Sequence, residues 1–327
     1  MHNYSELHQL FKKAIEQEIS EVGTRDPKNL YEPVIYTLNM GGKRIRPILL
    51  MMAFELFDAD IEQALPAAIA IEMFHNFTLL HDDMMDGSNL RRNNPTIHIK
   101  YSNNTAILSG DAMSILSYEY INKCQSDNYR QIFEIFTQTA LKICEGQQFD
   151  MDFETRNDVT VDEYLKMIGL KTAILIAASL KIGAMMANAP ESEADLMYDF
   201  GYNLGMAFQL QDDYLDAYGD TTSFGKNIGG DIVANKKTFL MLKAFEMADG
   251  GTREKLQKLV SASSFDHVQK IDAVKTIYSN LGVVDIAREL MEKYYNKAID
   301  CWERIDVDPE KKNELMLVAR NMMKRRT

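Results

Sequence analysis

The sequence predicts an all-α protein, and two features of its 327 residues support this fold class. Glycine (17 residues) and proline (7 residues) make up about 7 % of the chain, against roughly 12 % in average proteins. Few residues of these types imply few turns and long elements. No valine occurs between Val34 and Val159, whereas methionine, leucine, alanine and glutamate, which favour helices over strands, are plentiful.

Apolar residues recur with a helical period along most of the chain, and no stretch alternates as a strand of useful length would. A first helix carries Leu7, Leu10, Phe11 and Ile15 on one stripe. Further helices are predicted at residues 61–84, 106–121, 129–148, 161–186, 193–218 and 236–247, and amphipathic stretches fill residues 253–326. Gly87, Gly219 and the pair Gly229–Gly230 are expected to end helices. With no linker or repeat, residues 1–327 are predicted to form a single domain.

Composition excludes several classes of function. The chain carries 36 Lys and Arg residues against 48 Asp and Glu residues, and this net charge of −12 disfavours broad nucleic-acid binding. Cys124, Cys144 and Cys301 lack metal-ligand spacing and cannot all pair, which favours a reduced, cytoplasmic setting. The N-terminus has no apolar core typical of a signal peptide. The longest uncharged stretch, residues 200–211, is far shorter than the ~20 residues of a membrane span, so no membrane insertion is expected.

Two predicted helices end in the same acidic pattern, Asp-Asp-x-x-Asp. The first motif is HDDMMD, with Asp82, Asp83 and Asp86, and the second is QDDYLD, with Asp212, Asp213 and Asp216. Residues four apart share one face of a helix, so the first and last aspartate of each motif repel each other. Carboxylates at a helix C-terminus also oppose the helix dipole. Bound cations would remove both costs, and ligands that offer only oxygen favour Mg²⁺ or Mn²⁺ over zinc.

A single motif of this kind is more often a solvated acidic helix end. Here both motifs end strongly apolar helices, and repetition of the same pattern by chance is improbable. An EF-hand is excluded because the ligand ladder and central glycine of its 12-residue loop are missing.

Basic residues near the aspartates suggest what the metal would hold. They are Lys43, Arg44 and Arg46 in GGKRIRP, Arg91 and Arg92 in LRRNNPTIH, and Lys226, Lys236 and Lys237 beyond the second motif. Carboxylate-bound Mg²⁺ flanked by Lys and Arg is typical of a diphosphate site, because the metal bridges carboxylate and phosphate oxygens. The G-x-x-x-x-G-K-[ST] loop of nucleotide-binding proteins does not occur.

These motifs together resemble the polyprenyl synthetase family of trans-isoprenyl diphosphate synthases. The match runs through GGKRIRP, HNFTLLHDDMMDGSNLRRNNPTIH, GLKTA at residues 169–173, FQLQDDYLD and GKNIGGD. The resemblance implies an all-α helical bundle around a central apolar cavity, of the isoprenoid synthase type, and a homodimer. It also implies two substrates, isopentenyl diphosphate and an allylic diphosphate such as dimethylallyl, geranyl or farnesyl diphosphate.

The resemblance also implies roles for individual residues. Three aspartates would ligate a cluster of three Mg²⁺ ions on the allylic diphosphate: Asp82, Asp86 and Asp212. The other aspartates of the motifs, Asp83, Asp213 and Asp216, would orient ligands or bound water. Three basic residues would add positive charge to the same diphosphate: Arg91, Lys171 and Lys226. Four residues would bind isopentenyl diphosphate without metal: Lys43, Arg46, His75 and Arg92.

Thr172 and Gln209 resemble the groups whose oxygens face the developing allylic cation. GKNIGGD is one residue longer than the shortest family variants, so Lys236 and Lys237 compete for one phosphate-binding role, and Lys236 is preferred. The basic C-terminal MKRRT could close over the second diphosphate, but a solvated terminus is the simpler interpretation.

The implied chemistry begins with ionisation of the allylic C–O bond, for which Mg²⁺ and basic side chains stabilise the leaving group. The cation survives in a cavity that excludes water. The double bond of isopentenyl diphosphate then attacks it, and a proton is lost. No nucleophilic side chain is needed, and no Ser-His-Asp or Cys-His arrangement stands out in the sequence.

Phe77 and Phe74, five and eight residues before Asp82, are predicted to form the floor of the cavity that limits product length. An aromatic residue at the fifth position before DDxxD resembles the short-chain synthases, which predicts farnesyl or geranylgeranyl diphosphate (C15 or C20). The alternatives are a longer-chain synthase, a terpene cyclase, a non-catalytic partner subunit and a helical cation-binding protein. A cyclase usually mixes Asn, Ser or Thr with Glu in its second motif, and partner subunits typically lose one motif.

Overall fold

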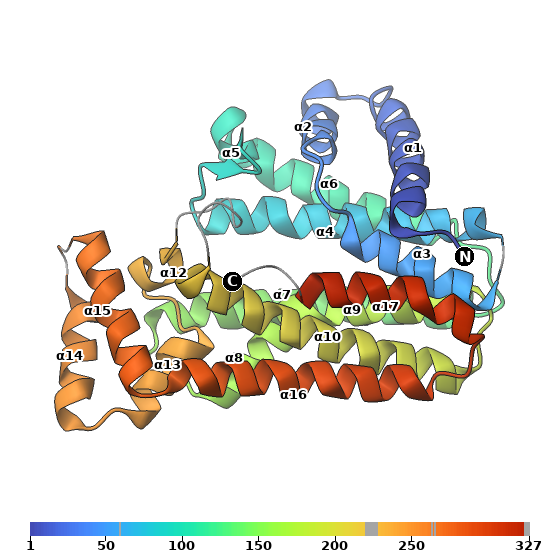
Figure 1. Cartoon of the computed structure of the whole chain (residues 1–327). Coiled ribbons are helices and arrows are strands. Elements are labelled where there is room, and N and C mark those ends of the chain that lie inside the picture. The colour runs from blue at the N-terminus through green and yellow to red at the C-terminus, as the bar shows by residue number, and fades with distance from the viewer. Residues whose placement is uncertain (59, 220–227, 263, 265, 324–327) are drawn as a thin grey trace. The chain divides into compact units, whose positions relative to one another are not determined.

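The computed structural model describes residues 1–327 except residues 59, 220–227, 263, 265 and 324–327. The described residues are almost entirely helical, as predicted (Figure 1). Contacts between Cα atoms group them into two compact units. Unit 1 comprises Met1–Ala140, Ala178–Tyr198 and Ile305–Met316, and unit 2 comprises Leu141–Ala177, Asp199–Arg304 and Leu317–Thr327. The single domain and its central cavity stay predictions.

Unit 1 is built on a central apolar helix, α4, which packs against α3 and α6. Helix α2 lies against α6, and α1 lies against α3 (blue to cyan in Figure 1). Almost every residue of α3 from Pro47 onward is buried, and so is most of α4. The elements are α1 (Tyr4–Val22), α2 (Lys28–Asn39), α3 (Ile45–Phe57), η1 (Ile61–Ala64), α4 (Leu65–Met85), α5 (Ile97–Lys100) and α6 (Asn103–Ile121).

Local sequence explains the ends of these helices. Helix α1 begins with a capping box, in which the Asn3 side chain accepts from the Glu6 amide and the Glu6 carboxylate accepts from the Asn3 amide. Pro66 lies in the first turn of α4, where its missing N–H costs nothing. The helix predicted at residues 61–84 is thus confirmed, except that its first four residues form the 3₁₀ turn η1.

A two-residue hairpin follows α4 and was not predicted. Strand β1 (Leu90–Arg91) pairs antiparallel with β2 (Asn94–Pro95). The two linking residues, Arg92 and Asn93, have φ of 51° and 63°. Positive φ at both central residues is the signature of a type I′ turn, which suits tight hairpins. The hairpin is too short for any alternation of apolar residues to indicate it.

Unit 2 has its own apolar core, formed by residues that include Tyr164, Met206, Leu215, Leu240 and Tyr278. Helix α13 packs against α8, α15 and α16. The elements with residues in unit 2 are α7 (Tyr129–Thr155), α8 (Val161–Ile168), η2 (Gly169–Ala173), α9 (Ile174–Met186), α10 (Glu191–Tyr218), α12 (Gly230–Val233), α13 (Phe239–Met247), α14 (Gly250–Ser261), α15 (His267–Asn280), α16 (Val283–Arg304) and α17 (Pro309–Met323). Of these, α7, α9, α10 and α17 also contribute residues to unit 1.

Several boundaries differ from the predictions, and the largest extension is that of α7, which ends at Thr155 instead of residue 148. Gly229 has a φ of 80° and starts the short helix α12, whereas the sequence analysis expected Gly229 and Gly230 to end a helix. The helix expected from residue 236 begins only at Phe239, because the Thr238 side chain caps it. Lys236 therefore lies in the loop before α13.

The helix predicted at residues 161–186 contains a π-helical turn, η2, between α8 and α9. Two glycines face this turn. A Cβ on Gly146 of α7 would lie 2.5 Å from the backbone nitrogen of Lys171, and a Cβ on Gly205 of α10 would lie 2.6 Å from the Cα atom of Ala173. The segment Val161–Met186 is long and apolar enough to cross a membrane by composition, but 78 % of its most apolar window is buried. This burial is typical of a core helix.

Candidate active site

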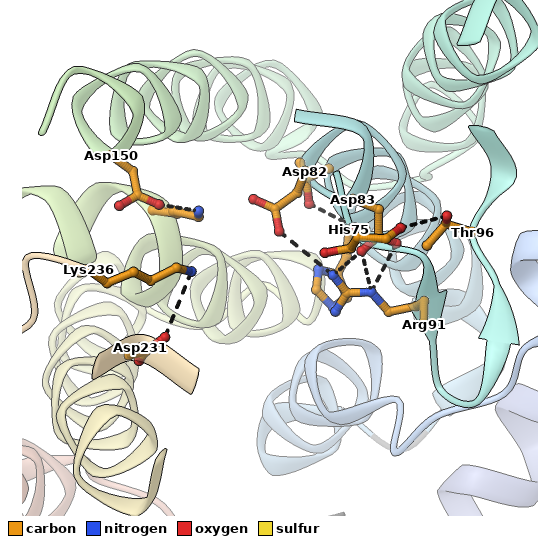
Figure 2. A network of polar contacts seen from close by, with 11 residues as sticks. His75, Asp82, Asp83, Arg91, Thr96, Asp150, Asp231 and Lys236 are labelled. Carbon is orange, nitrogen blue, oxygen red and sulfur yellow. Dashed lines mark hydrogen bonds and ion pairs between the residues drawn. The ribbon is translucent and has the colours of Figure 1, made fainter. Parts of the chain in front are cut away.

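The first aspartate motif occupies the last turn of α4. The Asp86 amide donates to the Asp82 carbonyl at 2.8 Å, so the helical turn continues to Asp86 and keeps both residues on one face. Asp83 is buried between them and is held by Arg91, whose Nε lies 2.9 and 3.0 Å from the two carboxylate oxygens (Figure 2). Arg91 Nη2 also lies 3.8 Å from Asp82. Burial raises the pKa of Asp83, and the Arg91 charge opposes this shift.

The second motif lies within α10. Asp213 is buried and accepts from Tyr164 Oη and, at 2.9 Å, from Gln209 Nε2. Burial, together with the charge of Asp231, raises the pKa of Asp213 to about 8. Asp216 accepts the Gly229 amide on its carbonyl at 2.6 Å and the Asp231 amide on its carboxylate at 2.9 Å. The motif thus anchors the start of α12.

Both motifs share one division of roles. The middle aspartate, Asp83 or Asp213, is buried and bound by protein donors, whereas Asp82, Asp86 and Asp212 keep part of their surface accessible. Two outward carboxylates one turn apart suit Mg²⁺, which takes one or two carboxylates and completes its shell with water and substrate phosphate. Within the described ranges, no three His, Cys, Asp or Glu side chains form a ready-made metal site. The donor set fits the predicted ligands, whose role stays a prediction.

Unit 1 also gathers a basic cluster from α3 and α4. Arg46 Nη1 lies 3.2 Å from His75 Nε2. Since an arginine only donates, His75 Nε2 accepts and the ring is neutral. Burial and the neighbouring arginines lower the pKa of His75 well below its usual value, and burial lowers that of Arg46 to about 10. Arg46 Nε is buried and has no hydrogen-bond partner among the described residues. An anion at this point would satisfy it.

A buried ion pair supports this cluster and was not predicted. Arg44, in the left-handed conformation before α3, donates to the Glu72 carboxylate and, at 2.5 Å, to the Leu38 carbonyl. Glu72 also accepts from Asn76 at 2.7 Å. Arg44 is thus occupied inside the protein, whereas Lys43 beside it is exposed. One feature of the sequence could have indicated this ion pair: a glutamate three residues before His75 in an otherwise apolar helix.

Arg92 is the fourth member of the predicted isopentenyl diphosphate site. It donates to the Gly41 carbonyl, and its guanidinium lies where Gly42 would carry a side chain. Burial and the charge of Arg44 lower the pKa of Arg92. The structure therefore brings Arg46, His75 and Arg92 together, as the sequence analysis expected.

The remaining predicted residues lie in unit 2. Lys171, in the π turn, forms an ion pair with Asp150 of α7 at 2.7 Å, and Asp150 was not predicted (Figure 2). Lys236 Nζ lies 4.0 Å from Asp231 and is half exposed. Thr172 donates to Gln209 Oε1 at 3.0 Å, so these two predicted residues are in contact. Lys226 and the tail from residue 324 lie outside the described residues.

Phe77 and Phe74 form an aromatic row on α4. Their ring centroids are 5.3 Å apart, and Phe74 also meets Phe136 of α7 at 5.7 Å. On the other side, Phe77 meets His81 edge to face at 4.9 Å. Phe74 is buried and Phe77 is partly exposed. The row runs along α4 toward the first aspartate motif, and its role as a chain-length floor stays a prediction.

Comparison with known proteins fits this geometry. The profile of the family described as Polyprenyl synthetase matches residues 27–279. The chain belongs to this family. It is 40 % identical over 287 residues to a geranylgeranyl diphosphate synthase from Sulfolobus acidocaldarius, covering 86 % of each chain. It is 34 % identical to a geranylfarnesyl diphosphate synthase from Natronomonas pharaonis, covering 96 % of this chain and 93 % of the relative.

A crystal structure of a geranylgeranyl pyrophosphate synthase superposes on the whole chain with a TM-score of 0.93 and 43 % identity, covering 100 % of both chains. Membership of the polyprenyl synthetase family confirms the all-α isoprenoid synthase fold. It also confirms the predicted enzyme class: the chain is a prenyltransferase of the trans-isoprenyl diphosphate synthase type, a class that makes short-chain prenyl diphosphates in the relatives named above.

Proposed function

We propose that this prenyltransferase condenses isopentenyl diphosphate with an allylic diphosphate and makes geranylgeranyl diphosphate as its main product. The observation that carries the proposal is the shared design of the two motifs, in which buried middle aspartates leave Asp82, Asp86 and Asp212 accessible. The basic cluster of Arg46, His75 and Arg92 offers a separate metal-free site for the second diphosphate.

The proposed cofactor is Mg²⁺, with three ions per active site and Mn²⁺ as a substitute. Asp82, Asp86 and Asp212 would hold the ions, which when bound neutralise the allylic diphosphate and stabilise it as a leaving group. Arg91, Lys171 and Lys226 add positive charge to the same group. Asp83 and Asp213 keep their helix ends in place through Arg91 and Tyr164.

The chain's own residues would then control the cation. Thr172 and Gln209 direct oxygen atoms toward the carbon that loses the diphosphate, and apolar walls exclude water. Arg46 and its neighbours hold isopentenyl diphosphate by charge-assisted hydrogen bonds so that its double bond reaches that carbon. A proton is lost after the new bond forms.

Product length follows from the aromatic row. Each added isoprene unit needs five more carbons of depth, and the Phe77 and Phe74 rings occupy that depth beside the first motif. Relatives named as geranylgeranyl diphosphate synthases support a C20 product, which lies within the predicted range of C15 or C20. The relative named as a geranylfarnesyl diphosphate synthase makes a C25 chain, one isoprene unit beyond that range.

One assay tests this function. The purified chain is incubated with labelled isopentenyl diphosphate, Mg²⁺ and dimethylallyl, geranyl or farnesyl diphosphate in turn, and dephosphorylated products are separated by chain length. We expect Mg²⁺-dependent label in a C20 alcohol. A cyclic hydrocarbon would indicate a cyclase, products of thirty carbons or more a long-chain synthase, and no incorporation with any primer would refute the proposal.

We also propose that the enzyme is a homodimer. Helix α6 exposes Leu108 and Ile115, which are 60 % and 70 % accessible and lie seven residues apart on one face. The family resemblance implies a second copy, and the proposal is that it covers this face. Ile115→Asp should shift the mass from dimer to monomer in light scattering, whereas Val268→Asp, at a similarly exposed valine on α15, should not. A wild-type monomer would contradict the proposal.

The enzyme is further proposed to act in the cytoplasm without inserting into membranes. Three free cysteines and the burial of the most apolar segment support this. Cell fractionation checks it, and recovery in a membrane pellet that resists high salt would exclude it.

A further inference from the structure

Four side chains of unit 2 form one continuous hydrogen-bonded chain, here called the relay. Tyr164 Oη donates to Asp213, Gln209 Nε2 donates to the other oxygen of Asp213 at 2.9 Å, and Thr172 Oγ1 donates to Gln209 Oε1 at 3.0 Å. Tyr164 and Asp213 are buried, with 2 % and 8 % of their surface accessible. The resemblance gives roles to three of these residues, but none to Tyr164.

The relay fixes which way the Gln209 amide faces. Asp213 meets Tyr164 at Oδ2 and Gln209 at Oδ1, so even a proton held between Oδ2 and Tyr164 leaves Oδ1 as an acceptor for the NH₂ end of Gln209. The carbonyl end must then point to Thr172, where a hydroxyl donates to it. If the amide turned over, its NH₂ group would face the reacting carbon. A positive dipole end there would destabilise a cation rather than stabilise it.

The π turn lets Tyr164 and Thr172 both reach α10. Eight residues of an uninterrupted α-helix turn through about 800°, which leaves the first and last side chains roughly 80° apart. A π turn closes its hydrogen bond over five residues instead of four and so takes more residues per turn. Because η2 starts at Gly169 and includes Thr172, it reduces the angular separation of Tyr164 and Thr172, and both side chains contact residues of α10.

We propose that Tyr164 is a positioning residue of this enzyme, which acts through Asp213 to hold Gln209 with its carbonyl oxygen toward the allylic carbon. This inference rests on the proposed condensation. Tyr164 touches neither substrate and supplies no charge. Its hydroxyl occupies one oxygen of Asp213, so that the carboxylate cannot rotate away from Gln209.

The test is steady-state kinetics of Tyr164→Phe, with each substrate varied in turn. We expect kcat to fall about tenfold or more, while the KM for isopentenyl diphosphate changes less than twofold. Tyr120→Phe is the matched control, because Tyr120 is also buried and donates to a carboxylate, Glu18, at 2.8 Å in unit 1. It should lose similar thermal stability and keep its kcat.

A double-mutant cycle separates positioning from general destabilisation. If Tyr164 acts through Gln209, then Gln209→Ala should lower kcat, and adding Tyr164→Phe should lower it little further. Additive losses, or a kcat for Tyr164→Phe equal to that of Tyr120→Phe, would overturn the inference. Should Tyr164→Phe fail to fold, Asp213→Ala replaces it in the same cycle, because it removes the acceptor of the Gln209 NH₂ group. The proposed function is tested by the activity of the wild-type protein alone, so its failure can be distinguished from a failure of this inference, which the variants test.

Discussion

At the scale of single residues, one buried and bound aspartate in each motif leaves its neighbours to meet solvent. Asp83 is clamped by Arg91, whereas Asp82 lies one residue away with 19 % of its side chain accessible. Two adjacent carboxylates thus have different environments, and substitutions at them should separate catalysis from stability.

We expect Asp82→Asn to lower kcat/KM by several orders of magnitude with little change in melting temperature, because it removes a proposed metal ligand and leaves the closer Arg91–Asp83 pair in place. Asp83→Asn should instead lower the melting temperature and reduce kcat/KM less than Asp82→Asn does. Loss of a charge-assisted hydrogen bond in a buried site costs about 1.5–3 kcal/mol. Kinetics with saturating Mg²⁺ and thermal melts measure both. Near-normal turnover in Asp82→Asn would remove it from the metal site.

His75 should make stability depend on pH. Its folded-state pKa is lowered by burial and by Arg46, while the unfolded value is about 6.5. Below that value the unfolded chain binds a proton that the folded chain does not, so stability falls as pH drops from about 6.5 toward the folded pKa. His75→Gln should flatten the slope of unfolding free energy between pH 7 and 5. Parallel slopes for both proteins in urea titrations would show that His75 takes up its proton equally in the folded and unfolded chains, which contradicts a lowered folded-state pKa.

At the scale of elements, the π turn η2 depends on two neighbouring helices that each have a glycine at the point of contact. Gly146 and Gly205 allow α7 and α10 to approach the backbone of η2, which bears Lys171 and Thr172. The geometry of these two residues is therefore set partly by glycines that never contact substrate.

Gly205→Ala should destabilise the protein by about 1–3 kcal/mol, the usual cost of overpacking, and also lower kcat because Thr172 moves. Gly250→Ala is the control: it lies in the first turn of α14, and nothing lies within 4 Å of its added Cβ. It should be neutral or slightly stabilising. The comparison needs melting temperatures and kcat, and equal effects of the two changes would contradict the packing argument.

At the scale of the whole molecule, product length is the property to test. Phe77→Ala, alone or with Phe74→Ala, should open the floor beside the first motif and lengthen the product by one or more isoprene units. Mass analysis of dephosphorylated products measures this. If the double variant makes wild-type product, the floor is built by other residues.

The sequence predicted most of the helices, both aspartate motifs and the aromatic row, because each has a pattern within one element, but it did not predict α2, α5 or α12. It did not predict features that arise between elements. The π turn needs close approach of Gly146 and Gly205, and the role of Tyr164 depends on a contact with Asp213, 49 residues away in the chain. Burial of Asp83 rather than Asp82 is likewise set by Arg91 in the hairpin.

Glu72 has a consequence for repeated rounds of synthesis. After each proposed condensation, the diphosphate brought by isopentenyl diphosphate remains on the lengthened chain and must leave Arg46 and Arg92 before the next addition. The negative charge of Glu72 acts on both arginines, so it weakens the grip on an anion. Glu72→Gln keeps an oxygen for Arg44 but removes this charge. It should lower the KM for isopentenyl diphosphate and shift products toward shorter chains, whereas Glu55→Gln, at another buried carboxylate, should not. Processive elongation in this enzyme then depends on a carboxylate that faces no substrate.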